Sequence, residues 1–281
     1  MTSLADIAGE YDAILSDVWG VVHNGIAAHE SAVDALLRYR QGGGRVVLIT
    51  NAPRPSQPII AMLDDLNVPR EAYDAVVSSG DVTRAMLAPY RGQTLHYVGP
   101  PEENDGLFEG FDITLGAPED AKAVIVTDLD DDSETPEDYT DRVAVWLKRG
   151  LPMICANPDR VVEHGNQIIY CGGALADLYE ARGGRIHMAG KPYRPIYDEA
   201  LRTADRVAGR PLDRTQILAI GDSVRTDAIG AANAGLDLLF VTGSIHAEEL
   251  DAFGSPDQAA IRNLVAPSGV RLKAFMPRLA W

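Results

Sequence analysis

Short runs of β-branched and aliphatic residues alternate along this chain with helix-length amphipathic segments. Three of the runs, Arg45–Thr50, Ala123–Thr127 and Gln216–Ile220, are continuous apolar stretches that do not alternate with polar residues. Such runs are typical of parallel strands covered on both faces, and their alternation with helices indicates an α/β fold. We therefore predict a doubly wound, Rossmann-like parallel sheet, whose strand order the sequence leaves open.

The same patterns give the expected elements. Strands are expected at Ala13–Ser16, Arg45–Thr50, Ala75–Ser78, Thr94–Val98, Ala123–Thr127, Pro152–Ala156, Gln216–Ile220 and Leu236–Val241. Helices are expected at Ser31–Arg40, Gln57–Leu66, Asp138–Lys148, Arg194–Ala208 and Thr226–Ala234, where apolar residues recur at helical spacing.

A middle zone of the chain differs from its flanks. It contains the acidic run Asp128–Glu137 and strand–helix patterns of its own. We predict a second α/β unit inserted into the first, with the Gly-rich stretch Arg182–Arg185 as the returning linker. The expected domains are a core of residues 1–92 and 186–281 and an insertion of residues 93–185.

Composition limits the classes of partner. The chain of 281 residues has 41 Asp and Glu against 25 Lys and Arg, a formal net charge of −16. An acidic surface repels phosphate backbones, so we expect no nucleic-acid partner. The same charge repels a phosphorylated substrate, so a phosphate-handling protein of this composition needs a cation in its site.

The ends and the cysteines point to an ordinary intracellular chain. Met1–Asp17 lacks a basic region followed by an apolar run, and no apolar stretch is long enough to span a membrane. We therefore expect a cytoplasmic location and no membrane partner. Cys155 and Cys171 both lie in apolar, strand-like surroundings, where we expect small buried hydrophobic side chains.

Polar residues follow several predicted strands or begin a helix, and ligands of open parallel sheets bind beyond the carboxyl ends of strands. Taken singly, each is an ordinary turn or helix-cap residue. Together they form one set with a coherent chemistry: Asp17, Thr50, Asn51, Lys191, Asp222 and Asp227.

The set can transfer a phosphoryl group. The Asp17 carboxylate can attack phosphorus and form an aspartyl phosphate. The hydroxyl, amide and ammonium groups of the set can hold the phosphoryl oxygens and offset their developing charge. Asp222 and Asp227 can anchor Mg²⁺, a hard cation that prefers oxygen ligands, and this ion would screen the nucleophile from an anionic substrate.

These segments, in this order, resemble the four signature motifs of the haloacid dehalogenase superfamily. The large insertion between the second and third motifs resembles the class IIA branch, which includes p-nitrophenylphosphatase-like, pyridoxal-phosphatase-like and sugar- or nucleotide-phosphatase-like proteins. Three further segments, Ser78–Gly80, Ala156–Asp159 and Gly173–Ala176, also resemble segments of that branch. The resemblance covers residues 11–245.

The resemblance implies a Mg²⁺-dependent phosphomonoesterase that acts on small phosphorylated metabolites, with residues 93–185 as a cap that selects the substrate. It also allows a homodimer, because caps of this branch often take part in dimer contacts. The implied nucleophile is Asp17, and the implied phosphate-binding residues are Thr50, Asn51 and Lys191. The implied metal ligands are Asp17, the Trp19 backbone carbonyl, Asp222, and Asp227 either directly or through water.

The first motif departs from the family pattern. Family phosphatases place a second aspartate two residues after the nucleophile as the general acid, and here that residue is Trp19. The Trp19 backbone carbonyl can still bind the metal, but the acid is lost. His23 could supply a proton, although beside Asn24 and Gly25 it is expected to be an exposed turn histidine.

Two other functions therefore stay open. Superfamily branches that process alkyl halides place an aromatic residue at the position of Trp19, which makes a haloacid-type dehalogenase the first alternative. The second is a module that binds magnesium and phosphate with little turnover. The large insertion, Thr50 and the two acids after the later strand favour phosphate chemistry over dehalogenation, whereas an assay of phosphate release with and without magnesium is needed to separate the enzyme from the binding module.

Overall fold

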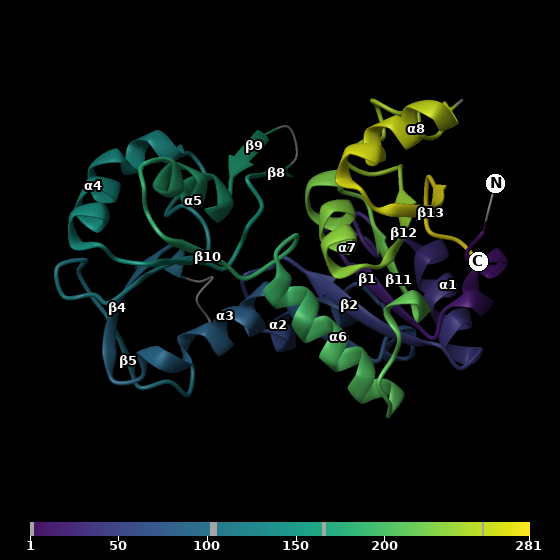
Figure 1. Cartoon of the computed structure of the whole chain (residues 1–281), viewed down its shortest axis with the longest axis horizontal. Coiled ribbons are helices and arrows are strands. Elements are labelled where there is room, and N and C mark those ends of the chain that lie inside the picture. The colour runs from purple at the N-terminus through teal and green to yellow at the C-terminus, as the bar shows by residue number, and fades with distance from the viewer. Residues whose placement is uncertain (1–2, 102–105, 165–166, 255) are drawn as a thin grey trace. The chain divides into compact units, whose positions relative to one another are not determined.

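The computed structural model describes residues 3–101, 106–164, 167–254 and 256–281 (Figure 1). The chain divides into two compact units. Unit 1 comprises Met1–Thr50, Gln57–Val77 and Lys191–Trp281, and unit 2 comprises Asn51–Ser56 and Ser78–Gly190. That residues 93–185 act as a substrate-selecting cap stays a prediction.

Unit 1 is built on a six-stranded sheet in the order β13-β12-β11-β1-β2-β3. Its strands are β1 (Ala13–Asp17), β2 (Arg45–Thr50), β3 (Ala75–Ser78), β11 (Ile217–Gly221), β12 (Asp237–Val241) and β13 (Arg271–Met276). β1 pairs in parallel with both β11 and β2, and β12 pairs in parallel with β11 and β13. β1 therefore lies at the centre of the sheet, with its carboxyl end beside those of two neighbours.

The central strands of unit 1 are covered on both faces. Every residue of β1, β11 and β12 is buried. In β2 only Arg45 is partly exposed, where its guanidinium lies 3.7 Å from Asp74. Full burial explains why these segments are continuously apolar, and it confirms the predicted parallel sheet.

Helices cover this sheet (Figure 1). They are α1 (Glu30–Gln41), α2 (Ser56–Asp65), α6 (Arg194–Ala208), α7 (Ile229–Ala234) and α8 (Gln258–Val265). α6 coincides with the predicted helix and packs along β1 and β2. The expected helix over residues 226–234 is instead a π-helical turn, Val224–Ala228, followed by α7. The turn forms because Asp227 N and Ala228 N both donate to Ser223 O, each at 3.0 Å.

Unit 2 contains a smaller parallel sheet in the order β10-β7-β6-β4-β5 and a separate antiparallel hairpin. The sheet strands are β4 (Gln93–Val98), β5 (Ile113–Leu115), β6 (Val124–Val126), β7 (Met153–Cys155) and β10 (Ile186–Met188). The hairpin strands are β8 (Val161–His164) and β9 (Gln167–Tyr170), and the helices are α3 (Ser79–Leu87), α4 (Thr140–Arg149) and α5 (Gly172–Ala181). Short 3₁₀ helices in the two units lie at Leu4–Asp6, Ala8–Glu10, Arg70–Ala72, Ala88–Tyr90, Pro136–Tyr139, Arg214–Gln216 and Ala266–Ser268.

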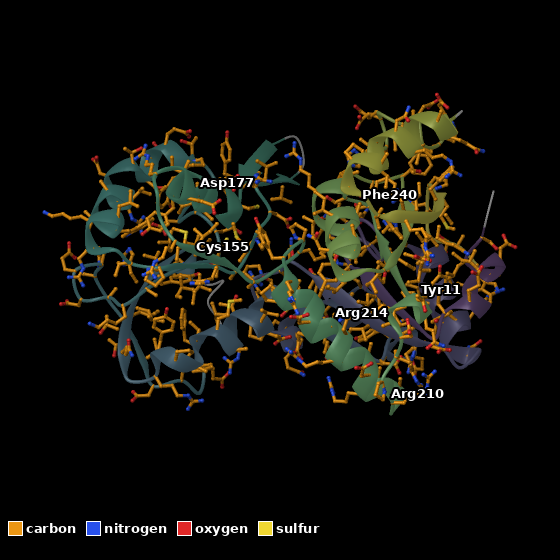
Figure 2. All side chains as sticks on the ribbon, in the orientation of Figure 1. Tyr11, Cys155, Asp177, Arg210, Arg214 and Phe240 are labelled. Carbon is orange, nitrogen blue, oxygen red and sulfur yellow. The ribbon has the colours of Figure 1, made fainter. Side chains whose placement is uncertain are left out.

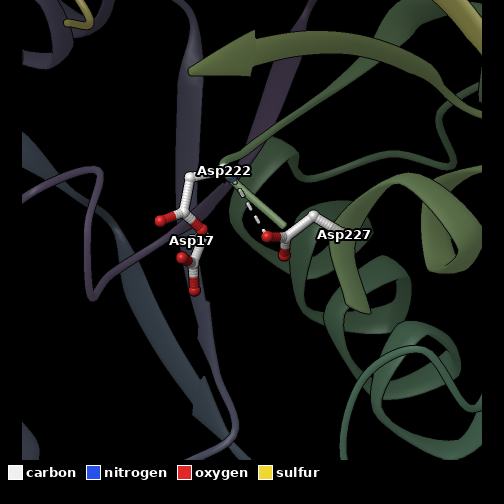
Figure 3. A group of neighbouring side chains, drawn as sticks. All are labelled: Asp17, Asp222 and Asp227. Atoms are coloured by element: carbon white, nitrogen blue, oxygen red, sulfur yellow. Dashed lines mark hydrogen bonds between the residues drawn. The ribbon is translucent and has the colours of Figure 1, made fainter. Parts of the chain in front are cut away.

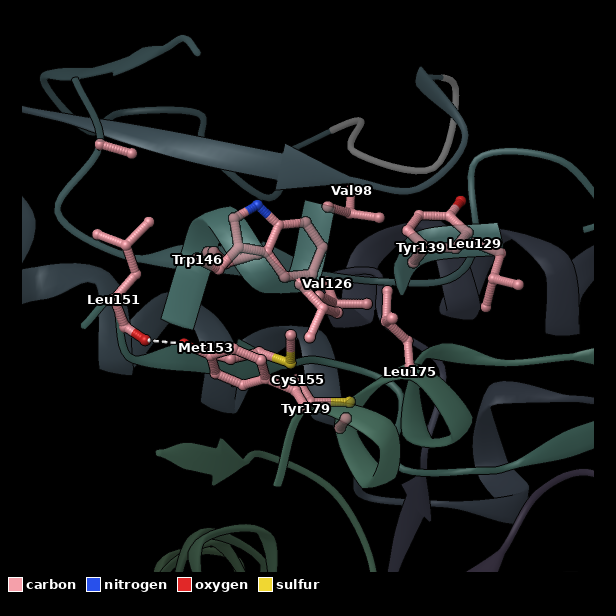
Figure 4. Packing of buried hydrophobic residues seen from close by; sticks show 14 of the residues in the cluster. Val98, Val126, Leu129, Tyr139, Trp146, Leu151, Met153, Cys155, Leu175 and Tyr179 are labelled. Atoms are coloured by element: carbon pink, nitrogen blue, oxygen red, sulfur yellow. Dashed lines mark hydrogen bonds between the residues drawn. The ribbon is translucent and has the colours of Figure 1, made fainter. Parts of the chain in front are cut away.

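Two large aromatic side chains meet in the core of unit 2. Trp146 of α4 and Tyr179 of α5 are almost fully buried, and their rings meet edge to face at 6.1 Å (Figure 4). The Tyr179 hydroxyl donates to Leu151 O at 2.6 Å, so its polar end is satisfied inside the core. Cys155 belongs to the same cluster (Figures 2 and 4), and both cysteines are buried and unbridged as expected.

Among the residues that the structure describes, no helix combines the length and the apolar character needed to cross a membrane.

Candidate active site

Asp17 ends β1, and the turn that follows it is tightly bonded. Gly20 N donates to His23 O at 2.7 Å, and Val22 N donates to Val18 O at 2.8 Å. Gly20 has φ +84°, and a β-carbon there would collide with the Asp222 carboxylate and the Ser244 hydroxyl. Only glycine therefore lets the chain pass so close to the carboxylates.

Asp222 and Asp227 join Asp17 because β11 lies beside β1 in parallel register. Carboxylate oxygens of the three residues all lie within 4.8 Å of one another, and all three side chains are buried (Figure 3). Asp227 Oδ2 accepts hydrogen bonds from Asp222 N at 3.2 Å and Ser223 N at 3.1 Å. Asp227 therefore fixes the loop that carries Asp222.

Lys191 lies in the same cluster. Its Nζ donates to Asp17 Oδ1 at 2.5 Å and to Asp227 Oδ1 at 2.7 Å, and the residue is 3% exposed. Burial by itself lowers the pKa of Lys191, but Asp17 and Asp227 outweigh it and hold that pKa well above its usual value. The lysine is therefore a permanent cation between two carboxylates.

The carboxylates themselves are held in an unfavourable environment. Burial raises the pKa of Asp17 well above its usual value, and Lys191 offsets part of this rise. Burial and the neighbouring Asp227 raise the pKa of Asp222 to about 7, while a hydrogen bond with the Ser244 side chain lowers it. A buried group of three carboxylates and one ammonium lacks positive charge, and its oxygens are the ligands that a hard divalent cation prefers.

Thr50 ends the strand on the other side of β1, and Asn51 follows it. Thr50 closes β2, so it lies at the same edge of the sheet as Asp17, and it is buried. Asn51 is also buried, and its Nδ2 donates to Asp159 Oδ1 at 3.0 Å within unit 2. The structure thus gathers four predicted residues, places Thr50 on the adjoining strand, and pairs Asn51 with Asp159.

Trp19 occupies the usual position of the general acid, His23 is the candidate substitute proton donor, and their side chains differ in exposure. The Trp19 side chain is 49% exposed, whereas His23 is 1% exposed. The expectation that His23 is an exposed turn histidine is wrong, because the turn folds its ring inward, where Nδ1 accepts the Gly25 N–H at 2.8 Å. Burial and the nearby His29 lower the pKa of His23 to about 4, so its imidazole is neutral near pH 7.

Ser244 and Gly20 are site residues that the motifs did not identify. Ser244 follows β12, the strand beyond β11, and its hydroxyl is hydrogen-bonded to Asp222. Ligands of parallel sheets bind beyond the carboxyl ends of the strands. An examination of the residues after the predicted strand Leu236–Val241 would therefore have identified Ser244.

Comparison with known proteins gives a consistent result. A family model described as haloacid dehalogenase-like hydrolase matches residues 14–111, and a second, described as HAD-hydrolase-like, matches residues 188–266. A haloacid dehalogenase-like family hydrolase of Brucella suis 1330 has a crystal structure that is 46% identical, with a TM-score of 0.83, covering 88% of this chain and 94% of that one.

Two further relatives carry names for an activity. The 5'-nucleotidase YutF of Bacillus subtilis is 25% identical over 233 residues, which cover 82% of this chain and 87% of that protein. The glycerol phosphate phosphatase Rv1692 of Mycobacterium tuberculosis, crystallised with magnesium, is 26% identical with a TM-score of 0.66. That match covers 87% of this chain and 70% of the relative.

Proposed function

The chain belongs to the haloacid dehalogenase-like hydrolases, and we propose that it is a magnesium-dependent phosphomonoesterase in which Asp17 attacks small phosphorylated metabolites. The observation that carries this proposal is the buried cluster of Asp17, Asp222 and Asp227 around Lys191. Three carboxylates and one ammonium carry a net charge of −2 when all are ionised. A divalent cation would neutralise that charge.

The donor set fits magnesium. Asp17 and Asp222 offer carboxylate oxygens that lie close together, and we assign the Trp19 backbone carbonyl, two residues after Asp17, as a further oxygen ligand of the kind a hard cation prefers. When bound, Mg²⁺ supplies charge neutralisation between the nucleophile and the phosphate. The magnesium complex of the glycerol phosphate phosphatase relative supports this choice of metal.

Asp227 has a different role in this scheme. Both of its carboxylate oxygens already accept hydrogen bonds, one from Lys191 and the other from two backbone N–H groups. We therefore assign Asp227 to support the ion through water and to hold the loop of Asp222. Asp17, Asp222 and the Trp19 backbone carbonyl would bind the ion directly.

The chemistry proceeds in two displacements. A carboxylate oxygen of Asp17 attacks phosphorus, the ester P–O bond breaks, and the leaving oxygen departs with the bonding electron pair. Water then attacks the phosphorus of the aspartyl phosphate, which frees the Asp17 carboxylate and releases inorganic phosphate. Thr50, Asn51 and Lys191 are assigned to the phosphoryl oxygens, where hydrogen bonds and positive charge stabilise the transition state.

We assign substrate selection to unit 2. Residues 93–185, which lie within unit 2, are assigned as the cap. The relatives named as a 5'-nucleotidase and a glycerol phosphate phosphatase support a small phosphorylated metabolite as the substrate class.

The test is product release by the purified full chain. With Mg²⁺ present, a panel of phosphorylated metabolites and 4-nitrophenyl phosphate should release inorganic phosphate, and excess chelator should abolish it. Chelator-resistant halide release from 2-haloacids, without phosphate release, would instead establish the dehalogenase alternative. Tight metal-dependent binding of phosphate without turnover would establish a binding module.

A further inference from the structure

The exposed large apolar side chains of unit 1 are not spread evenly over its surface. Among its described residues they are Trp19, Ile26, Tyr193, Ile245, Phe253 and Trp281. All but the last belong to segments that follow a strand or a residue of the site in the chain: two follow β1, one lies two residues after Lys191, and two follow β12. Trp281 lies at the opposite edge, beside the residues that precede β1 and β2. A large apolar side chain that stays exposed two residues after the nucleophile indicates a ligand with an apolar part.

Trp19 is the member of this group nearest the nucleophile, and its ring is held in place. The benzene edge of the indole packs on Gly25, where a β-carbon would collide with Cη2. On another side the imidazole of His23 meets it edge to face, with ring centroids 5.3 Å apart and planes at 73°. Half of the side chain nevertheless stays exposed. A large aromatic surface that is both fixed and exposed can bind a flat group at little entropic cost.

The same residue limits the chemistry of the leaving group. The indole N–H donates hydrogen bonds but does not release its proton near neutral pH. His23 is 1% exposed and its Nδ1 already accepts the Gly25 N–H, so it is turned away from solvent, and the turn from Val18 to Gly25 contains no other acidic or basic side chain. From this turn, a leaving oxygen receives no proton. Substrates whose leaving group departs as a stable anion are therefore favoured.

Resting on the proposed phosphatase function, we propose that Trp19 makes this enzyme selective for phosphate esters of flat aromatic alcohols, by stacking against the aromatic leaving group. Such an ester meets both conditions at once, since an aryl oxide is a good leaving group and an aromatic ring stacks on the indole. Stacking of this kind changes affinity by roughly three- to tenfold.

The test separates stacking from leaving-group chemistry. 4-Nitrophenyl phosphate and acetyl phosphate both release a stable anion, but only the first carries a ring. Trp19→Leu should raise KM for 4-nitrophenyl phosphate roughly three- to tenfold more than it raises KM for acetyl phosphate. Trp19→Phe should keep most of the affinity. The matched control is Trp281→Leu, which removes an exposed indole at the other edge and should change neither substrate.

A binding measurement on the wild-type chain makes the same test without a variant. In the presence of Mg²⁺, phenylphosphonate should inhibit roughly tenfold more tightly than methylphosphonate. Equal inhibition by the two phosphonates, or an equal rise in KM for both substrates in Trp19→Leu, would overturn the inference. Good turnover of acetyl phosphate with none of the aryl ester would overturn it while leaving the phosphatase function intact. Failure to release phosphate from any ester would refute the phosphatase function itself.

Discussion

Lys191 Nζ lies 2.5 Å from Asp17 Oδ1 in the interior of unit 1, where the two residues are 3% and 6% exposed. The residues are far apart in the chain, and they meet because Lys191 precedes α6 and α6 packs along β1. The pair places a cation at the nucleophile before any substrate arrives. It therefore serves both stability and the proposed chemistry, and the two can be measured separately.

Replacement of Lys191 by methionine should destabilise the chain strongly. The variant leaves buried carboxylates without their cation, which typically costs about 3–5 kcal/mol. Urea unfolding in the absence of metal measures this loss, and phosphate release should fall at least about a hundredfold. Lys273→Met is the control, because Lys273 pairs with the more exposed Glu10 and such pairs contribute about 0–1 kcal/mol. A loss of stability no larger than that of the control would show that the pair does not hold the cluster.

Magnesium affinity should depend on pH in one direction. Burial raises the pKa of Asp222 to about 7, so below that pH a proton occupies the carboxyl and must be displaced by the ion. Without metal, the folded chain should lose stability as pH rises from the pKa of this carboxyl in the unfolded chain to its raised pKa in the folded chain, because the buried carboxyl must ionise. Bound Mg²⁺ relieves that cost, so stabilisation by Mg²⁺ should grow with pH.

Calorimetric titration with Mg²⁺ tests this relationship. The dissociation constant should rise roughly tenfold for each pH unit below about 7 and level off above it. Asp222→Asn should weaken magnesium binding by more than roughly a hundredfold, since even residues that only support metal ligands cost up to that much. An affinity that stays constant from about pH 5.5 to about pH 8.5 would contradict the assignment of Asp222 as a direct ligand.

Gly20→Ala should disable the site through geometry. At φ +84° the added β-carbon meets Asp222 and Ser244, so the carboxylate must move, and the backbone itself costs about 1–3 kcal/mol. The control is Gly209→Ala in the same unit, with φ +70° and open space around its β-position. Both variants should lower the melting temperature, but only Gly20→Ala should lose most of its magnesium affinity and phosphate release. Equal activity in the two variants would show that Gly20 is needed only for its backbone angle.

Much of the core of unit 1 could be predicted from the sequence, because fully buried parallel strands are continuous apolar runs. The predicted strand Arg45–Thr50 and helix Arg194–Ala208 coincide with β2 and α6. β13 was missed because it alternates charged with apolar residues: Arg271 pairs with Asp237, and Lys273 pairs with Glu10. That pattern belongs to an edge strand, which apolar runs cannot reveal.

Other features depended on contacts between distant segments. α5 begins with two glycines, which propensity disfavours in a helix. The structure needs them because a β-carbon at Gly173 would overlap the main chain of Pro158, while Asp128 accepts the Gly172 N–H at 2.9 Å. Similarly, the burial of His23 depends on how its turn folds, and local sequence suggested an exposed residue.

Restoring an acid at position 19 should change the range of substrates. Without one, turnover of the wild type should fall steeply as the leaving group becomes less acidic, so alkyl esters should be slow. General acid catalysis contributes roughly 10²–10⁴-fold, and Trp19→Asp should therefore speed alkyl phosphates relative to aryl phosphates by at least about tenfold. A series of esters with graded leaving-group acidity measures both slopes. Equal wild-type rates for alkyl and aryl esters would mean that another acid is in place.

The most direct measurement of the central claim is capture of the aspartyl phosphate. Full-length protein with Mg²⁺ is mixed with ³²P-labelled 4-nitrophenyl phosphate and quenched in acid, and the labelled peptide is identified. We predict label on the peptide that contains Asp17, removable by hydroxylamine and absent in Asp17→Asn. The control Asp12→Asn, at the other end of β1, should keep it, because Asp12 lies at the surface, where it pairs with Arg210. Label on another residue, or sustained magnesium-dependent turnover by Asp17→Asn, would contradict the account.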